Sequence, residues 1–261
     1  MVTQASVPRA FIPEFPGREV TVHEIGAGEE HKSLATVEML CRAFAAHGLT
    51  RADVVVGVGG GMVTDLVGAF WQPSAVACDT DALVSLPERE IRCGTGEMAK
   101  YHFIAREDIA ALDLPARIAR SVEIKARIVE ADERESGERA LLNYGHTLGH
   151  AIETVTGYAV AHGEAVALGL LYAAHLARVL GRIDSARVEE HYRVVRDVYG
   201  LTTGPPAGLE FARLLAEMRR DKKAVSALTF VLDSPAGLEV VTGVPETAAA
   251  AAWDEYAAAN R

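Results

Sequence analysis

The spacing of apolar residues divides the first third of the chain into short strands and a helix. The run VTVHEIG, ending at Gly26, alternates apolar and polar positions as a strand does. The next segment places apolar residues at helical spacing and predicts a helix that stops at Gly48. The valine run after Asp53 predicts a buried parallel strand, and SAVACDTDAL predicts another short strand. The helical apolar positions are Leu34, Val37, Leu40, Phe44 and Leu49.

The pattern changes after Pro87. From Glu88 to about Gly200 the chain is rich in Ala, Glu, Arg, Leu and Ile, and it predicts helices almost throughout. Near the C-terminus, TFVLDSPAGLEVVTG predicts a hairpin and AAAAAWDEYAAAN predicts a terminal helix. We therefore place a boundary near Leu86. The expected fold is an α/β domain over residues 1–86 followed by a mainly α-helical domain over residues 87–261.

Three histidines and two glutamates gather in the stretch LLNYGHTLGHAIETVTGYAVAHGE. His146, His150 and Glu153 recur at i, i+4 and i+7, so they share one face of a helix. His162 follows a Thr-Gly-Tyr turn, at the expected start of the next helix. This spacing can assemble a divalent metal site from one helix and the following turn. From spacing alone, histidines on the surface or in the core are an equally good interpretation.

A glycine cluster follows the valine run. Gly59, Gly60 and Gly61 lie between an expected strand and an expected helix, an arrangement whose backbone N–H groups can hold a phosphate. Asp65, in that helix, could accept a hydrogen bond from a sugar hydroxyl. The spacing is not G-x-G-x-x-G, and a simple tight turn explains it as well.

Further polar residues surround the histidines in the sequence. Glu97 and Lys100 stand at i, i+3 near the expected N-terminal turn of a helix, either as a solvated ion pair or as a metal ligand beside a cation. Arg139 and Asn143 continue the histidine spacing upstream, at steps of four and three residues, and so predict one polar helical stripe. Such a stripe is either exposed to solvent or part of a site, because burying its groups unpaired costs several kcal/mol.

Composition excludes several classes of function. The chain has 261 residues, 49% hydrophobic and 24% charged, with a formal net charge of −10. That charge argues against general binding to nucleic acid or a membrane surface, but it allows a small anionic substrate held by a few cations. The three cysteines have no Cys-x-x-Cys spacing, and we see neither a signal peptide nor a membrane-spanning run. We expect a soluble cytoplasmic protein.

Several motifs occurring in order resemble 3-dehydroquinate synthase, a sugar phosphate cyclase of the shikimate pathway. The resemblance runs from about Gly26 to Phe230, and its most specific parts are LNYGHTLGHAIE and HGEAVALG. It implies a Rossmann-like N-terminal domain that binds NAD and an α-helical C-terminal domain that binds a divalent metal, zinc or cobalt. The remaining motifs are GEEHKS, GVGGGMVTD, DTDALVSLPERE, GEMAKY and DKK.

The resemblance also assigns roles to residues of this chain. The implied reaction converts 3-deoxy-D-arabino-heptulosonate 7-phosphate to 3-dehydroquinate and phosphate, in a homodimer. The implied metal ligands are Glu97, His146 and His162. The implied substrate-contacting residues are Lys100, Lys125, Arg139, Asn143, Lys222 and Lys223. The implied proton-transfer residues are Glu135 and His150. The implied NAD contacts are Glu29, Lys32, Gly59, Gly60, Gly61 and Asp65.

The chain departs from the family pattern in its NAD-binding half. Val67-Gly68 runs almost directly into AFWQPSAVACDT, so several dozen family residues are absent, together with NAD contacts and a substrate lysine. A parallel sheet that loses central strands would be open at an edge. Three hypotheses follow: a compacted 3-dehydroquinate synthase, another cyclase such as one making an aminocyclitol or valiolone precursor, or a non-catalytic metal-binding remnant.

Overall fold

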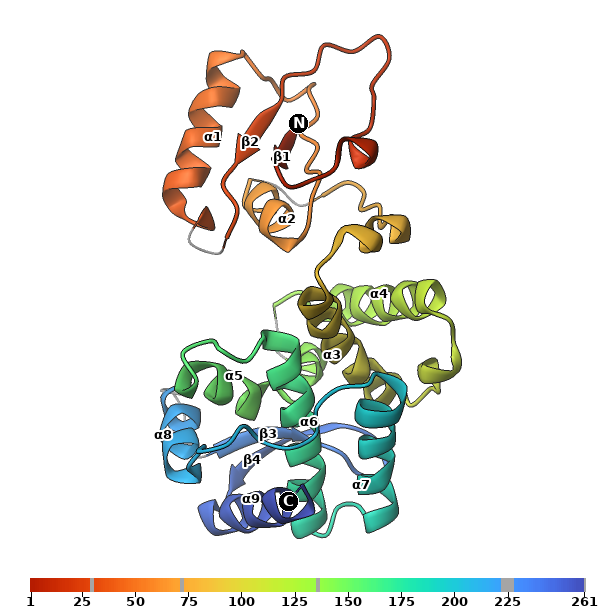
Figure 1. Cartoon of the computed structure of the whole chain (residues 1–261), viewed down its shortest axis with the longest axis vertical. Coiled ribbons are helices and arrows are strands. Elements are labelled where there is room, and N and C mark those ends of the chain that lie inside the picture. Colours follow the sequence, from red (N-terminus) through yellow and green to blue (C-terminus); the bar gives the residue numbers. More distant parts are fainter. Residues whose placement is uncertain (29–30, 71–72, 135–136, 222–227, 261) are drawn as a thin grey trace. The chain divides into compact units, whose positions relative to one another are not determined.

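A computed structural model describes residues 1–28, 31–70, 73–134, 137–221 and 228–260 (Figure 1). The chain forms two compact units, Met1–Ser85 and Leu86–Arg261. This division differs by one residue from the boundary expected from the sequence.

The first unit is small and has few strands. Strand β1 (Val2–Gln4) pairs in parallel with β2 (His23–Ile25), and Val2 lies opposite His23. Helix α1 (Leu34–Ala46) begins at the Ser33 cap, whose side chain accepts a hydrogen bond from a backbone N–H of the first turn, and α2 is Gly61–Gly68. Five buried apolar side chains form the core of this unit: Val2, Ile25, Leu40, Val63 and Leu66.

Two strands expected in this unit are wrong. The valine run is not a buried strand, because Val54 is 78% exposed and the segment joins β1 only through a parallel bridge between Val2 and Gly57. SAVACDTDAL contains no strand, and a 3₁₀ helix occupies Thr80–Ser85. A strand needs a neighbour to satisfy its backbone groups, and within the described residues β1 and β2 offer only two short ones. The Rossmann-like arrangement of this unit stays a prediction.

The second unit is built around helix α6 (His162–Val179), as the sequence predicted for a mainly helical domain (Figure 1). Every residue from Gly163 to Ala177 except Glu164 is buried, because Ala, Gly and Leu occupy all sides of the helix. Helices α3 (Glu88–Ala105), α5 (His146–Val155), α7 (Ser185–Tyr192) and α9 (Glu246–Ala259) pack against α6. Helix α4 (Leu114–Ala131) packs on α3, and α8 (Phe211–Asp221) packs on α5. None of the described helices combines the length and apolar character required to cross a bilayer.

The C-terminal hairpin and helix are confirmed. Strands β3 (Leu228–Leu232) and β4 (Glu239–Val244) pair antiparallel, with Leu232 opposite Glu239. Gly237 has a φ of 126° in the connecting turn, a backbone angle that side-chain-bearing residues rarely adopt. Helix α9 follows directly and contributes Trp253 and Tyr256 to the core around α6.

Candidate metal centre

Three side chains from three helices meet at one point of the second unit. His146 is the first residue of α5 and His162 the first of α6, whereas Glu97 lies inside α3. The Nε2 atoms of both histidines lie 3.2 Å from Oε1 of Glu97. Glu97 was expected near the N-terminal turn of its helix. That expectation is wrong, because α3 begins nine residues earlier, at Glu88. Ligand atoms of these three residues all lie within 4.8 Å of one another, which is suitable for a single cation.

A close crossing of α3 and α6 brings two of these ligands together. A Cβ atom added to Gly96 would lie 2.1 Å from the carbonyl oxygen of Gly163, and one added to Gly163 would lie 1.7 Å from that of Cys93. Only glycine permits this approach of the two backbones. Gly96 precedes Glu97 and Gly163 follows His162, so the crossing places the carboxylate beside the imidazole.

Hydrogen bonds to the Nδ1 atoms determine which histidine nitrogens face the carboxylate. Nδ1 of His146 lies 3.1 Å from the Tyr144 carbonyl oxygen, which can only accept a hydrogen bond. Nδ1 of His162 lies 3.1 Å from Oε2 of Glu153. Each Nδ1 therefore donates, which leaves each Nε2 as the ring nitrogen that lies beside Glu97 Oε1.

The remaining atoms of the cluster fit a metal ion. Oε1 of Glu97 is buried, and among the described residues no N–H group is aligned to donate to it, although two Nε2 atoms lie nearby. A carboxylate oxygen and two imidazole nitrogens that converge in this way attract a divalent cation. Two histidines and one carboxylate also leave coordination positions open for a substrate.

The charges of the centre are strongly coupled. Burial would raise the pKa of Glu97, but the imidazoles of His146 and His162 and the charge of Lys100 hold it well below its usual range. Lys100 is nearly buried, and its Nζ lies 2.6 Å from Oε2 of Glu97. Burial lowers the pKa of Lys100, against the opposing effect of Glu97. The contact with Glu97 raises the pKa of His162 to about 9, so a proton on His162 balances the carboxylate until a cation displaces it.

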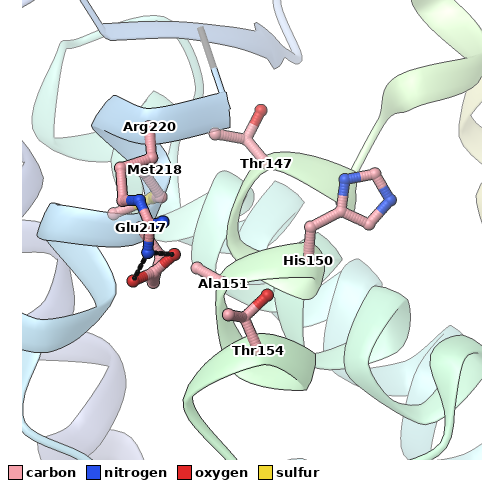
Figure 2. Close-up of a pocket in the computed structure, with 7 residues that line it drawn as sticks. All are labelled: Thr147, His150, Ala151, Thr154, Glu217, Met218 and Arg220. Atoms are coloured by element: carbon pink, nitrogen blue, oxygen red, sulfur yellow. Dashed lines mark hydrogen bonds and ion pairs between the residues drawn. The ribbon is translucent and has the colours of Figure 1, made fainter. Parts of the chain in front are cut away.

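His150 is exposed beside the centre. Its ring centroid lies 5.4 Å from that of His146 and 5.8 Å from that of His162. His150 also lines a cavity of about 310 Å³ between α5 and α8 (Figure 2), in which Nη1 of Arg220 pairs with Glu217 at 3.0 Å. The lining residues are Thr147, His150, Ala151, Thr154, Glu217, Met218 and Arg220.

The single polar stripe expected from Arg139 to His150 is wrong. Arg139 and Asn143 belong to a 3₁₀ helix, Glu138–Asn143, that ends before α5 begins. Gly145, with a φ of 82°, breaks the helical path between the two segments, so residue spacing does not carry across it. Arg139 donates through Nη1 to the backbone carbonyl of Glu133, and Asn143 is exposed.

The other predicted residues of this unit divide into two groups. Lys125, on α4, is exposed, and its charge is close enough to Lys100 to lower the pKa of that amine further. Glu135, Lys222 and Lys223 lie outside the described residues.

The predicted NAD contacts belong to the first unit. Nζ of Lys32 pairs with Oδ2 of Asp65 at 2.9 Å. A Cβ atom on Gly59 would lie 2.5 Å from the Val63 side chain, whereas one on Gly60 or Gly61 would have nothing within 4 Å. The backbone at the start of α2 is therefore open, as a phosphate site requires. Glu29 lies outside the described residues.

Sequence reasoning missed the residues that hold the ligands in place. Tyr144 acts through its backbone carbonyl, which no residue pattern encodes. The sequence does contain a hint of the contact between Gly96 and Gly163, because each glycine is next to a predicted ligand. Only the structure shows that the two glycines meet.

Comparison with known proteins identifies the family. Residues 94–224 match the family described as 3-dehydroquinate synthase C-terminal, and residues 22–68 match the one described as 3-dehydroquinate synthase N-terminal. The chain belongs to the 3-dehydroquinate synthase family. Its relatives include a protein named "Putative aminodehydroquinate synthase" from Amycolatopsis mediterranei (strain S699), which is 45% identical over 94% of this chain and 81% of that protein. The 3-dehydroquinate synthase of Leifsonia xyli subsp. xyli (strain CTCB07) is 36% identical over 92% of this chain and 82% of that one.

These relatives also confirm that this member of the family is shortened. The alignment with the Amycolatopsis protein extends over 287 positions, more than the 261 residues of this chain, so that relative carries residues with no counterpart here. The two matched regions leave residues 69–93 between them, which includes the place where the sequence indicated a loss.

Solved structures of sugar phosphate cyclases share the two-domain fold. A 2-deoxy-scyllo-inosose synthase, complexed with carbaglucose-6-phosphate, NAD⁺ and Co²⁺, matches with a TM-score of 0.78 and 21% identity, over 95% of this chain and 88% of that one. The 2-epi-5-epi-valiolone synthase ValA from Streptomyces hygroscopicus, with NAD⁺ and Zn²⁺ bound, matches with a TM-score of 0.72 and 18% identity, over 92% and 83%. At these identities the similarity establishes the fold alone.

Proposed function

We propose that this member of the 3-dehydroquinate synthase family converts 3-deoxy-D-arabino-heptulosonate 7-phosphate to 3-dehydroquinate and phosphate. The observation that carries the proposal is the centre formed by Glu97, His146 and His162, where a carboxylate oxygen and two imidazole nitrogens converge. The proposal assigns NAD binding to residues 1–86 and metal and substrate binding to residues 87–261, in a homodimer.

The three ligands would hold a divalent cation, zinc or cobalt. Such a cation would bind neighbouring hydroxyls of a sugar and make them more acidic, and bound NAD would supply reversible oxidation at a carbon that carries one of them. Lys100 is buried beside Glu97, so it keeps that carboxylate ionised and holds positive charge where an anionic substrate would approach.

The remaining assignments follow the same logic. His150 is exposed beside both ligand histidines and can move a proton at the bound sugar. Glu135 would share that task. Four positively charged side chains and one side-chain amide would bind the phosphate and carboxylate of the substrate and so fix its orientation. These residues are Lys125, Arg139, Asn143, Lys222 and Lys223.

In the first unit, the start of α2 would hold a phosphate of NAD. Gly60 and Gly61 leave the backbone N–H groups open, and Lys32 adds a positive charge that Asp65 keeps in place. Gly59 shapes the turn against Val63, and Glu29 would complete the NAD contacts.

A second candidate is formation of an amino analogue of 3-dehydroquinate. It is favoured by the 45% identity to the Amycolatopsis relative, compared with 36% for the Leifsonia enzyme. Under this hypothesis the same centre would act on a heptulosonate phosphate in which an amino group replaces a hydroxyl or ring oxygen. Cyclases of other sugar phosphates share the fold, but their lower identity gives no reason to prefer them.

The test is phosphate release by the purified chain, supplied with NAD and with zinc or cobalt. We expect release from the heptulosonate phosphate to require NAD, and His146→Ala and His162→Ala each to abolish stoichiometric metal binding. Faster turnover of the amino substrate would favour the second candidate. Release at an equal rate without NAD, or an unchanged metal content in both variants, would refute the proposed mechanism.

A separate titration addresses the shortened half. A chain that binds metal but shows no NAD affinity and no turnover would be a non-catalytic remnant. Fluorescence titration with NAD, with and without metal, distinguishes this outcome from a compacted enzyme.

A further inference from the structure

Tyr144 links the metal centre to the interior of the second unit. Its side chain is fully buried, and its phenol oxygen lies 2.7 Å from Nε2 of His191. Its backbone carbonyl oxygen lies 3.1 Å from Nδ1 of His146. One residue therefore makes two hydrogen bonds, one into the core and one to a ligand histidine.

The directions of these bonds follow from their partners. Nδ1 of His191 lies 2.8 Å from the backbone carbonyl oxygen of Arg187, which can only accept. His191 thus carries its proton on Nδ1, and its Nε2 accepts the proton of the Tyr144 hydroxyl. Burial lowers the pKa of His191 to about 4, so the neutral ring persists at neutral pH.

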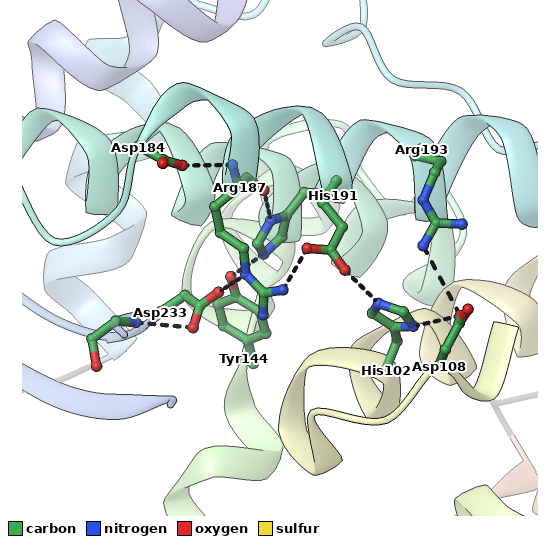
Figure 3. A network of polar contacts seen from close by, with 10 residues as sticks. His102, Asp108, Tyr144, Asp184, Arg187, His191, Arg193 and Asp233 are labelled. Atoms are coloured by element: carbon green, nitrogen blue, oxygen red, sulfur yellow. Dashed lines mark hydrogen bonds and ion pairs between the residues drawn. The ribbon is translucent and has the colours of Figure 1, made fainter. Parts of the chain in front are cut away.

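His191 belongs to a network of polar contacts (Figure 3). The ring of Phe103 stacks on it with a centroid distance of 3.8 Å and an interplanar angle of 4°. The guanidinium of Arg187 pairs with the buried Asp233 and with Glu190, each at 2.6 Å. The network ties α7 to the end of β3, so the acceptor for the Tyr144 hydroxyl has a fixed position.

The backbone between Tyr144 and His146 has little freedom either. Gly145 adopts a φ of 82°, and a Cβ atom there would lie 2.7 Å from the carbonyl oxygen of Val166. A Cβ atom on Gly169 would lie 1.9 Å from the carbonyl oxygen of Gly145. The peptide is held against α6 on one side and by the phenol on the other.

We propose that Tyr144 and His191 are positioning residues for the metal ligand His146. Their hydrogen bond fixes the carbonyl group that orients the imidazole, so that Nε2 is directed at the metal position. The inference rests on the proposed metal binding, and it adds residues that do not touch the metal.

The test compares two buried tyrosines. Tyr144→Phe removes the hydroxyl and keeps the ring. Tyr192→Phe is the control, since the Tyr192 hydroxyl lies 3.1 Å from Nε2 of the buried His175 and accepts from Nδ2 of Asn260 at 2.7 Å, and neither contact involves a proposed ligand. We expect Tyr144→Phe to weaken zinc and cobalt binding about tenfold, in the range seen when a partner of a ligand is lost. Tyr192→Phe should leave both affinities unchanged.

The measurements are chelator competition for the affinities and the visible absorption of the cobalt-loaded chain for ligand geometry. His191→Phe, which retains a ring against Phe103, should weaken binding to the same degree, and the double variant should add little. Equal metal affinity in Tyr144→Phe and the unmodified chain would overturn the inference, as would equal weakening in Tyr192→Phe. Absence of metal binding by the unmodified chain would instead overturn the proposed function, and the inference with it.

Discussion

The glycine contact between α3 and α6 gives a sharp test of how the metal centre is built. In Gly96→Ala the new methyl group would lie 2.1 Å from the carbonyl oxygen of Gly163, against an ordinary contact of 3.4 Å or more. The helices must therefore separate by about 1 Å, since the atom in the way is backbone and cannot rotate aside. The Nε2 of His162 now lies 3.2 Å from Glu97, and ligand geometry tolerates shifts of only about 0.5 Å.

Two effects should follow from this separation. Overpacking of a tight core position destabilises a protein by about 1–3 kcal/mol, and we expect the upper part of that range because two backbones collide. Zinc affinity should fall at least tenfold, because the carboxylate moves away from the imidazole. Urea unfolding measures the first effect and chelator competition the second.

Gly94→Ala provides the matched control on the same helix. Gly94 is exposed, and an added Cβ atom would have nothing within 4 Å. Alanine should therefore stabilise α3 by about 0.5–1 kcal/mol through its higher helix propensity, and it should leave zinc binding unchanged. If Gly96→Ala matched Gly94→Ala in both measurements, the contact would not be what positions the ligands.

Two further predictions concern charge. The folded-state pKa of His191, about 4, lies below its ordinary value of 6.5, so the unfolded chain takes up the proton first and acid favours unfolding. Between pH 6.5 and 4 this residue should remove about 3 kcal/mol of the free energy of unfolding. Urea unfolding across that window should show a shallower pH dependence in His191→Phe, and an unchanged slope would contradict the buried neutral ring. Glu153→Gln keeps an oxygen that can accept from Nδ1 of His162 but removes its charge, so zinc affinity should fall about tenfold by chelator competition. Unchanged affinity would mean that Glu153 serves packing alone.

The family motifs named Glu97, His146 and His162 together, and the structure brings these three side chains to one point, whereas helical spacing alone pointed to His146, His150 and Glu153. His162 begins a helix at the expected place, after the Thr-Gly-Tyr turn, whereas His146 begins a helix that was expected to extend upstream through Arg139. The polar stripe from Arg139 failed for a physical reason. The spacing argument holds only within one continuous helix. Gly145, with its positive φ, interrupts the helix, although the spacing of the polar residues on either side of it is unchanged.

Two of the strands expected in the first unit failed for a different reason, whereas the run VTVHEIG does contain β2. A valine run has a high strand propensity, but a strand also needs a second strand to pair with. That partner comes from a segment distant in the sequence, which local propensity does not reveal. Val54 is 78% exposed because the segment pairs on one side only, with β1. The shortening inferred from the sequence was thus a better guide to this unit than its local pattern.

The distribution of the site between the units separates the two halves of the proposed activity. All three candidate ligands, the residues hydrogen-bonded to them and the glycine contact lie within Leu86–Arg261. This unit has its own large apolar core around α6, whereas the core of the first unit has five buried apolar residues. Loss of a stretch from the first unit therefore leaves in place the three candidate ligands and the glycine contact of the second unit. Metal affinity should consequently be insensitive to changes at Gly60 and Gly61, and NAD affinity is the quantity that decides whether the shortened chain completes the reaction.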